Sequence, residues 1–339
     1  MWLKDIGTAL GVVLGLKSDE VHTSATLGTC ANSTQDASTI KVMTFNTFLI
    51  SCLPKGLDFV EEVKCQNEDE REVRVQEIVN WFATRDEDIV LLQEVWSFHD
   101  ELRNGMSDAG YCHYIMTEET IGSGLAIFSK HPIDQQSNKD EQYVSWMNGI
   151  AADVESVESA AKGVLYTNIT KDGHNIHVFN MHTTSDSFGD NHDVRVEQFN
   201  IVKDFVDSKD IPSNELVLLG GDFNEDKDCS SNTCNGIEAY CTNQTYYNEM
   251  IEILSADIPT YLGDSYTYDT EENTLLKGLY SEEDCDYYRY TLDYILYSKK
   301  HLIPSLDMSS CEVVYPLASD GIGIDLSDHL PVSCTFSSL

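Results

Sequence analysis

Residues 217–224 read Val-Leu-Leu-Gly-Gly-Asp-Phe-Asn, an apolar run that ends in a polar pair. The apolar residues are typical of a buried strand. Because unpaired polar groups inside a sheet are costly, Asp222 and Asn224 are expected at the strand end. Two residues apart in extended chain, they project in one direction, and Gly220-Gly221 lets the backbone approach a ligand closely. The alternative is a Gly-rich turn with an Asx cap.

The same arrangement recurs along the chain. Strand-like runs stop at Asn46 after V-M-T-F, at Glu94 after I-V-L-L-Q and at His182 after V-F-N-M, and L-S-D-H-L-P-V carries Asp328 and His329. Carboxylate and amide oxygens suit Mg²⁺, and imidazoles move protons near neutral pH. Together these strand ends predict one metal site on a sheet rim, with phosphate-ester hydrolysis as its chemistry.

Each polar residue also has a structural alternative. Glu94 suits a loop salt bridge, Asn46 suits a turn, and a lone histidine is commonly structural. Asp328 beside His329 is a candidate to fix the tautomer of the imidazole, although adjacent residues need not touch. Asp293 interrupts the apolar run T-L-D-Y-I-L, so it must be paired, and His182 or His329 is its expected partner.

Strand patterns dominate the chain, and helical patterns lie between them. Apolar residues at i, i+3, i+4 and i+7 mark a helix over 75–82, and a second apolar stripe marks one over 199–206. Further helices are expected near 98–109 and 246–254. Strands are expected at 40–46, 88–94, 112–117, 124–129, 163–169, 176–182, 215–221, 291–297 and 331–336. This mixed order favours an α/β sandwich with sheets inside and helices outside.

Composition limits the choice of partners. The 339 residues carry a net charge of −37 and no Lys/Arg cluster, which disfavours nucleic acid and strongly anionic membranes. A general solubility or high-salt adaptation is an alternative origin of the acidity. No repeat or hinge is visible, so residues 39–339 are predicted to form a single catalytic domain after a leader and polar linker over 1–38.

Several features favour a secreted protein, with a lumenal one as the alternative. There are ten cysteines, and Cys229, Cys234 and Cys241 crowd a loop typical of a disulfide-stapled insertion. The apolar stretch 6–16 suits a signal peptide with cleavage after 23–25, although a frayed helix is the alternative. N-glycosylation sequons begin at Asn32, Asn168 and Asn243.

Six motifs in this order resemble the endonuclease/exonuclease/phosphatase superfamily, from about residue 40 to the end. The resemblance implies a DNase I-like four-layered α/β sandwich of two packed mixed β-sheets flanked by helices. The motifs are N-T-F at Asn46, Q-E-V-W at Glu94, M-H-T at His182, G-G-D-F-N at Asp222, T-L-D-Y-I at Asp293 and S-D-H-L-P-V at Asp328.

Longer stretches add to these motifs: K-G-V-L-Y-T from Lys162, the run from Asp204 through Asn224, P-T-Y-L-G-D-S-Y-T-Y-D-T-E-E-N from Pro259 and L-D-Y-I-L-Y-S-K-K-H from Leu292. In these stretches the chain is most similar to secreted bacterial neutral sphingomyelinases. This resemblance implies Mg²⁺-dependent hydrolysis of sphingomyelin to ceramide and phosphocholine, with Mn²⁺ or Co²⁺ as alternative ions. It also implies a monomer that acts on phosphocholine lipids at a membrane surface and binds no nucleic acid.

The resemblance also implies residue roles. Glu94 would bind the principal metal with Asn46 near it, and His329 would be the general base, close to the metal and beside Asp328. Asp222 and Asn224 would hold the attacking water and phosphate, or a second metal. His182 would stabilise phosphate oxygens or protonate the alkoxide that leaves, and Asp293 would support a histidine.

One stretch departs from this pattern. Bacterial members carry an aromatic hairpin that enters the membrane, whereas residues 313–317 here retain apolar side chains without Trp or Phe. Trp96 and Phe98 are an alternative membrane contact, and core packing explains them equally well. The rival functions are a phospholipase C on glycerophosphocholine lipids, a DNase I-like nuclease and a non-catalytic lipid-binding module.

Overall fold

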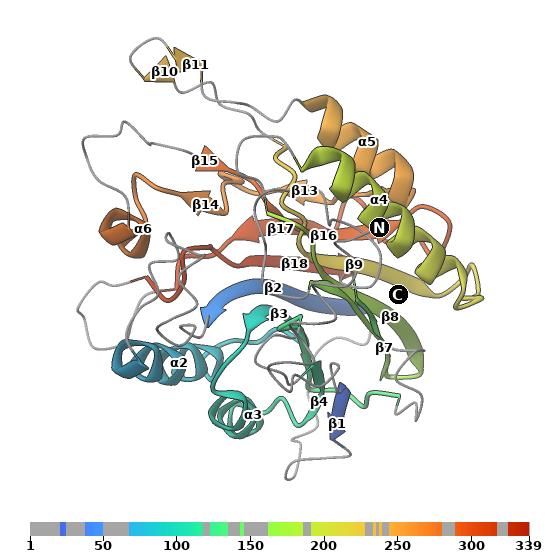
Figure 1. The fold of residues 1–339 in the computed structure, drawn as a ribbon. Helices are drawn as coiled ribbons and strands as arrows, with labels where there is room; N and C mark the ends of the chain where they lie inside the picture. Colours follow the sequence, from blue (N-terminus) through green and yellow to red (C-terminus); the bar gives the residue numbers. More distant parts are fainter. Residues whose placement is uncertain are drawn as a thin grey trace, which may run out of the picture.

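Two β-sheets pack face to face and helices cover their outer faces, which gives four layers (Figure 1). The fold class predicted from the sequence is therefore confirmed. The computed structural model describes residues 21–24, 38–49, 68–117, 123–134, 143–145, 162–185, 191–227, 233–234, 237–238, 244–279, 289–316 and 325–338.

The first sheet has eight strands in the order β1-β4-β5-β3-β2-β18-β17-β13. Its centre is the parallel pair β2 and β3, and β18 lies antiparallel to β2. The bounds are β1 (Val21–Ser24), β2 (Thr39–Leu49), β3 (Ile89–Val95), β4 (His113–Thr117), β5 (Ala126–Ser129), β13 (Thr260–Tyr261), β17 (Ser310–Val313) and β18 (Val332–Ser337).

The second sheet has six strands in the order β12-β16-β9-β8-β7-β6. Here β8 and β9 are the parallel pair, and β16 lies antiparallel to β9. The bounds are β6 (Tyr143–Ser145), β7 (Gly163–Lys171), β8 (His174–His182), β9 (Leu216–Asp222), β12 (Ala256–Asp257) and β16 (Asp293–Ser298). Two short ladders pair β10 (Thr233–Cys234) with β11 (Ile237–Glu238) and β14 (Tyr268–Asp269) with β15 (Arg289–Tyr290).

The helices lie on the two outer faces. The first sheet is covered by α2 (Glu68–Phe82) and α3 (His99–Asp108), and the second by α4 (His192–Asp207) and α5 (Gln244–Leu254) (Figure 1). A short helix, α6 (Thr274–Leu279), follows β14. Among the helices that the structure describes, none is both long and apolar enough to cross a membrane.

Alternation along the strands explains the layers. In β2, Ile40 and Val42 face the second sheet, while Met43 and Phe45 face the helices of their own side. Successive side chains of a strand point to opposite faces, so a strand buried on both faces is apolar on both. This explains why the central strands read as continuous apolar runs in the sequence.

The predicted elements occur within a few residues of their expected positions. The sequence signals missed the two-residue strands β10 to β15, because pairs of residues carry no periodicity, and also β1, β6 and β17. Val21–Ser24 pairs antiparallel with β4, so this part of the segment predicted to be leader and linker belongs to the sheet edge. The remaining signal-peptide features, two sequons (Asn32 and Asn243), Cys229 and Cys241 lie outside the described residues.

Polar contacts also join the two sheets through the apolar interior. Asn180 of β8 donates to the carbonyl oxygens of Leu92 and Ala126, at 2.8 and 2.9 Å, and accepts from Gln93 Nε2 at 2.7 Å. A buried amide with its hydrogen bonds satisfied costs little and specifies one register. This contact therefore fixes the position of one sheet relative to the other.

A buried ion pair joins the sheets at the end of β7. Lys171 Nζ lies 3.0 Å from Asp88 Oδ2, both side chains are fully buried, and Nζ also donates to the Thr39 carbonyl. Burial alone would raise the pKa of Asp88, but hydrogen bonds from His131, the Lys41 amide and Lys171 outweigh it and lower the pKa. The pairing therefore stabilises the folded state at neutral pH.

Covalent links are present as well. Cys311 of β17 and Cys334 of β18 are register partners and form a disulfide. Cys112 is also disulfide-bonded, and no cysteine within the described ranges is free. The disulfides expected from the cysteine count are thus seen in part.

We expect Asp88→Asn to lower the free energy of unfolding by about 3–5 kcal/mol at pH 7, because it leaves the Lys171 ammonium buried without its charge partner. Asp86→Asn is the matched control: its carboxylate is 63% exposed beside Lys41, so the expected loss is about 0–1 kcal/mol. Urea unfolding followed by circular dichroism measures both.

The same pair predicts a pH dependence. The pKa of Asp88 is lowered from 3.8, so its stabilisation is present above about pH 4 and is lost as the pH falls further. The gap between wild type and Asp88→Asn should therefore narrow towards pH 3. A gap that stays constant from pH 7 to pH 3 would contradict the assignment.

Candidate active site

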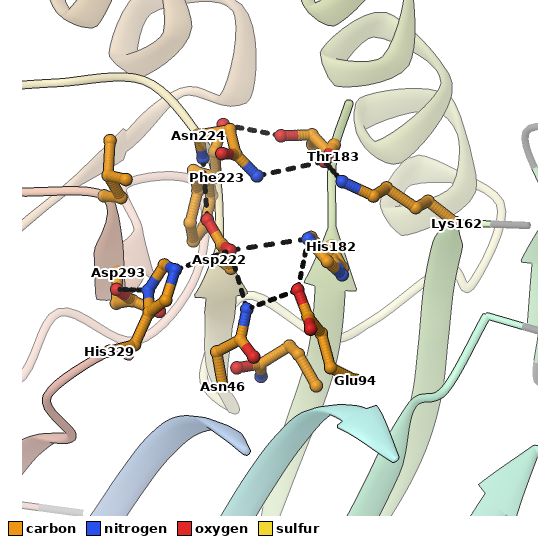
Figure 2. Close-up of polar contacts among 12 residues, drawn as sticks. Asn46, Glu94, Lys162, His182, Thr183, Asp222, Phe223, Asn224, Asp293 and His329 are labelled. Carbon is orange, nitrogen blue, oxygen red and sulfur yellow. Dashed lines mark hydrogen bonds and ion pairs between the residues drawn. The ribbon is translucent and has the colours of Figure 1, made fainter. Parts of the chain in front are cut away.

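The polar strand ends predicted from the sequence meet at one rim of the sandwich (Figure 2). Parallel pairing brings the ends of β2 and β3 together in one sheet and those of β8 and β9 in the other, where His182 and Asp222 are register partners. Antiparallel pairing adds the first residue of β16, Asp293, opposite Asp222.

Asn46 connects the two sheets at this rim. Its Nδ2 donates to Glu94 Oε1 and to Asp222 Oδ2, each at 3.0 Å (Figure 2). Glu94 is 13% exposed and Asp222 2% exposed by side chain. One amide thus holds two carboxylates from opposite sheets beside each other.

The backbone is strained at two of these residues. Glu94 has φ 57° and Asn224 has φ 48°, in the left-handed region that non-glycine residues rarely adopt. Such conformations cost about 1–3 kcal/mol and occur where the surroundings over-determine them, often at functional sites. At Gly221, with φ 140°, a Cβ would lie 1.9 Å from the Met181 carbonyl oxygen, so only glycine lets β9 pass β8.

Asp293, rather than Asp328, is the carboxylate that orients His329. His329 Nδ1 lies 2.8 Å from Asp293 Oδ2, and its Nε2 lies 3.8 Å from Asp222 Oδ2 (Figure 2). Asp328 instead accepts a hydrogen bond from Ser327 Oγ at 3.1 Å. Asp293 was expected beside His182 or His329, and the structure pairs it with His329. Asp328 therefore does not fix the tautomer of His329, although its charge contributes to the raised pKa of that imidazole.

His182 faces the same carboxylates from the other side. Its Nε2 lies 3.4 Å from Asp222 Oδ2 and 3.9 Å from Glu94 Oε1, and its ring lies beside Trp96. Burial, reinforced by the positive charges of Lys162 and His329, holds the pKa of His182 well below its ordinary value. His182 is therefore neutral at physiological pH.

The two imidazoles differ in charge because their surroundings differ. Burial alone would lower the pKa of His329, but the carboxylates of Asp293 and Asp222 outweigh it and raise this pKa well above its ordinary value. Burial raises the pKa of Asp293 to about 6 despite the nearby imidazole. Burial and the charge of Asp328 raise the pKa of Glu94 to about 8.

The crowded carboxylates have the chemistry of a cation site. Ligand atoms of Asp222, Asp293 and His329 lie within 4.8 Å of one another. Glu94 Oε2 and Asp293 Oδ1 are buried and find no hydrogen-bond partner among the described residues. Buried anionic oxygens without donors are costly, and a cation removes that cost. The residues present thus fit a divalent metal ion.

Two residues of the site, Lys162 and Arg74, do not follow an apolar strand in the sequence, so the pattern of polar strand ends did not predict them. Lys162 is buried at the start of β7, and its Nζ donates to the Thr183 carbonyl at 2.9 Å; Asn224 Nδ2 donates to the same oxygen at 3.1 Å (Figure 2). Arg74 of α2 donates to the carbonyls of Thr47 and Leu326. Lys162 appears in the sequence only inside a stretch of family resemblance, and Arg74 resembles any polar residue of an amphipathic helix.

The aromatic candidates for membrane contact differ in how far they are exposed to solvent. Trp96 is 7% exposed and packs near His182, so it belongs to the core, and Phe98 is half-buried under Arg71. Tyr315, in the short stretch that departs from the bacterial pattern, is 59% exposed. Leu317 and most of the following segment lie outside the described residues.

Comparison with known proteins agrees with this geometry. The profile of the Endonuclease/Exonuclease/phosphatase family matches residues 43–329, which include every residue of the site. The chain belongs to this family. The match spans strands of both sheets.

Within the family, the chain is similar to several sphingomyelinases C. The chain is 30% identical over 329 residues to a sphingomyelinase C of Leptospira interrogans, covering 89% of this chain and 52% of that protein. It is 28% identical over 363 residues to a sphingomyelinase C of Bacillus cereus, covering 98% and 96%. The chain thus spans about half the length of the Leptospira relative and nearly all of the Bacillus one.

A solved structure supports the fold. A crystal structure of a Staphylococcus aureus beta toxin variant with bound magnesium ions is similar with a TM-score of 0.60 and 22% identity. The likeness covers 88% of this chain and 100% of that one. At this identity the comparison speaks for the fold of the chain.

The raised pKa of Glu94 predicts a stability change in the metal-free protein. Between its ordinary pKa of 4.5 and about 8 the folded state holds a proton that the unfolded state has released. The free energy of unfolding should therefore fall as the pH rises through this window, and Glu94→Gln should weaken that slope. Thermal unfolding in EDTA at pH 5 to 8 measures it.

Binding of Mg²⁺ should stabilise the folded protein. Mg²⁺ should raise the midpoint of wild type and raise that of Glu94→Gln much less. Glu72→Gln, an exposed change in α2, is the control and should match wild type. Equal metal-induced shifts in wild type and Glu94→Gln would exclude Glu94 as a ligand.

Proposed function

We propose that the protein is a secreted, Mg²⁺-dependent phosphodiesterase that hydrolyses sphingomyelin to ceramide and phosphocholine. The observation that carries this proposal is the pair of histidines on either side of Asp222. His329, held by Asp293, and the neutral His182 both approach Asp222 Oδ2, at 3.8 and 3.4 Å. The likeness to sphingomyelinases C over most of the chain supports the substrate.

The proposed metal ligands are Glu94, Asn46, Asp222 and Asn224. His329, also expected at the metal, keeps its Nε2 for the proton of the water, because its Nδ1 is bonded to Asp293. The ligand donors are mainly oxygens, which favours Mg²⁺ over Mn²⁺ or Co²⁺. When bound, such a cation supplies neutralisation of the phosphodiester oxygens and makes a bound water more acidic. A positive charge among the carboxylates also opposes the raised pKa of His329, which favours a neutral imidazole in the loaded enzyme.

Proton transfer and stabilisation of charge are then assigned to different residues of the protein. His329 takes the proton of the attacking water as general base, and Asp293 stabilises the imidazolium that forms. Neutral His182 donates a hydrogen bond to a phosphate oxygen and helps to protonate the ceramide alkoxide that leaves, while the proton taken up by His329 restores the balance after the reaction; the positive charge of Lys162 acts on His182. Asp222 and Asn224 orient the water and the phosphate, and Asp328 acts through its charge on Glu94.

Surface properties support a zwitterionic lipid rather than nucleic acid. A net charge of −37 repels polyphosphates, whereas phosphocholine lipids carry no net charge. Exposed Tyr315 offers a contact with the lipid interface. The Cys311–Cys334 disulfide supports folding in an oxidising compartment, and hence secretion or a lumenal location. We propose a monomer whose catalytic domain covers residues 39–339.

We expect the purified protein to release phosphocholine from sphingomyelin vesicles in Mg²⁺ and to stop when EDTA is added. Phosphatidylcholine vesicles and DNA are run beside it. Faster cleavage of phosphatidylcholine would favour a phospholipase C, cleavage of DNA would favour a nuclease, and vesicle binding without release of any product would favour a lipid-binding module.

His329→Gln should lower kcat about 10²–10⁴-fold, because it removes the general base. His174→Gln is the matched control, since His174 is exposed at the start of β8, at the opposite end of the strand from His182, and should leave kcat unchanged. Thermal unfolding checks that both variants are folded. A folded His329→Gln enzyme with a near-normal rate would exclude His329 as the base.

A further inference from the structure

Arg195 is a fully buried arginine in the first half of α4, outside the set of polar strand ends. Arginine is almost never fully buried unless it is paired. A buried guanidinium carries a desolvation cost of several kcal/mol, which only good geometry and further hydrogen bonds offset. The contacts of Arg195 therefore show which parts of the structure it holds in place.

The Arg195 guanidinium joins the two loops that leave the site. Its Nε donates to Glu225 Oε2 at 2.8 Å, and its Nη1 donates to the Thr184 carbonyl at 3.3 Å. Glu225 directly follows Asn224, and Thr184 is two residues beyond His182. One side chain thus contacts the segments that carry site residues after β8 and after β9.

Neighbouring contacts fix both loops against the same helix. One turn further along α4, Gln198 Nε2 donates to Thr184 Oγ1 at 2.7 Å, and the Thr184 amide donates to Gln198 Oε1 at 3.0 Å. The Glu225 carbonyl accepts from Tyr294 Oη of β16 at 2.7 Å, and His192 Nδ1 lies 3.4 Å from Glu225 Oε2. Glu225 is therefore held at both its side chain and its backbone.

The segment between these anchors is the strained one. Asn224 adopts φ 48°, its amide donates to Asp222 Oδ1 at 3.0 Å, and its Nδ2 donates to the Thr183 carbonyl at 3.1 Å. Asparagine adopts this left-handed region more readily than most residues, and here its contacts and fixed neighbours select it. The Arg195–Glu225 pair, one residue away and fully buried, is such a constraint.

We propose that Arg195 and Glu225 are positioning residues for the reaction, a role that rests on the proposed function. Through the α4 contacts they hold Asn224 in its strained conformation and keep the loop after His182 in register with the loop after Asp222. A displacement of about 1 Å at reacting groups lowers rates about 10²-fold. The guanidinium contacts Glu225, the residue after Asn224, and the Thr184 carbonyl, so we argue that the pair acts through Asn224 and Thr184.

Arg195→Lys and Glu225→Gln separate geometry from charge. Lysine keeps the charge but lacks the planar fork that spans two acceptors, and glutamine keeps the shape of Glu225 without its charge. We expect each change to lower kcat roughly 10–100-fold and to raise the Mg²⁺ concentration for half-maximal rate, because Asn224 is a proposed metal ligand, with the KM for sphingomyelin in mixed micelles within about twofold of wild type. The double variant should lose little more than either single one, because both changes break one contact.

Lys171→Met is the matched control. It also breaks a fully buried ion pair, with Asp88, but at the far end of β7 from the site. It should lower the unfolding midpoint and leave kcat unchanged. All rates are measured well below the lowest midpoint, so that every variant is folded. If Arg195→Lys and Glu225→Gln behave like Lys171→Met, with lower midpoints and wild-type kcat, the pair is structural and the proposal is overturned.

A crystal structure of Glu225→Gln decides the same point without turnover. The proposal expects Asn224 to leave the left-handed region or the Thr183–Thr184 backbone to shift; unchanged loops would overturn it. Wild-type turnover on the substrate panel is measured first. Its absence would count against the proposed function, and the structure of the variant would still decide the positioning role.

Discussion

The constraint on which the site depends is the face-to-face packing of two sheets whose central parallel strands end at the same rim. Neither sheet alone places more than part of the polar set together. Asn46 makes the dependence explicit, because its single amide nitrogen holds Glu94 of one sheet and Asp222 of the other. The apolar interior and the amide contact of Asn180 fix the position of one sheet relative to the other, and hence the spacing of the carboxylates.

The metal-free rim is electrostatically unfavourable by construction. Glu94 and Asp293 have raised pKa values because burial disfavours their charged forms, and His329 is drawn towards its charged form by the same carboxylates. Perturbations of this kind concentrate at functional sites. The fold tolerates them because the strain is confined to strand ends while the apolar layers supply the stability.

Much of the fold and most of the site were predictable from the sequence, and the failures have physical causes. Long strands such as β2 and β9 are apolar on both faces and stop at polar residues, so pattern alone located Asn46 and Asp222. Pairs across space were readable only in part: Asp293 was expected beside His182 or His329, and only the structure shows that its partner is His329, 36 residues away. Lys162 and Arg74 contact backbone carbonyls, and such contacts leave no trace in a sequence.

The pairing of β2 with β18 has a consequence for biosynthesis. Ser327 Oγ donates to the Asn46 carbonyl across 281 residues, and His329 enters the site only when β18 joins β2. Contacts this distant in sequence form late, since the closure of so long a loop must precede them. A chain emerging from the ribosome therefore has an incomplete site until β18 is made and docked against β2.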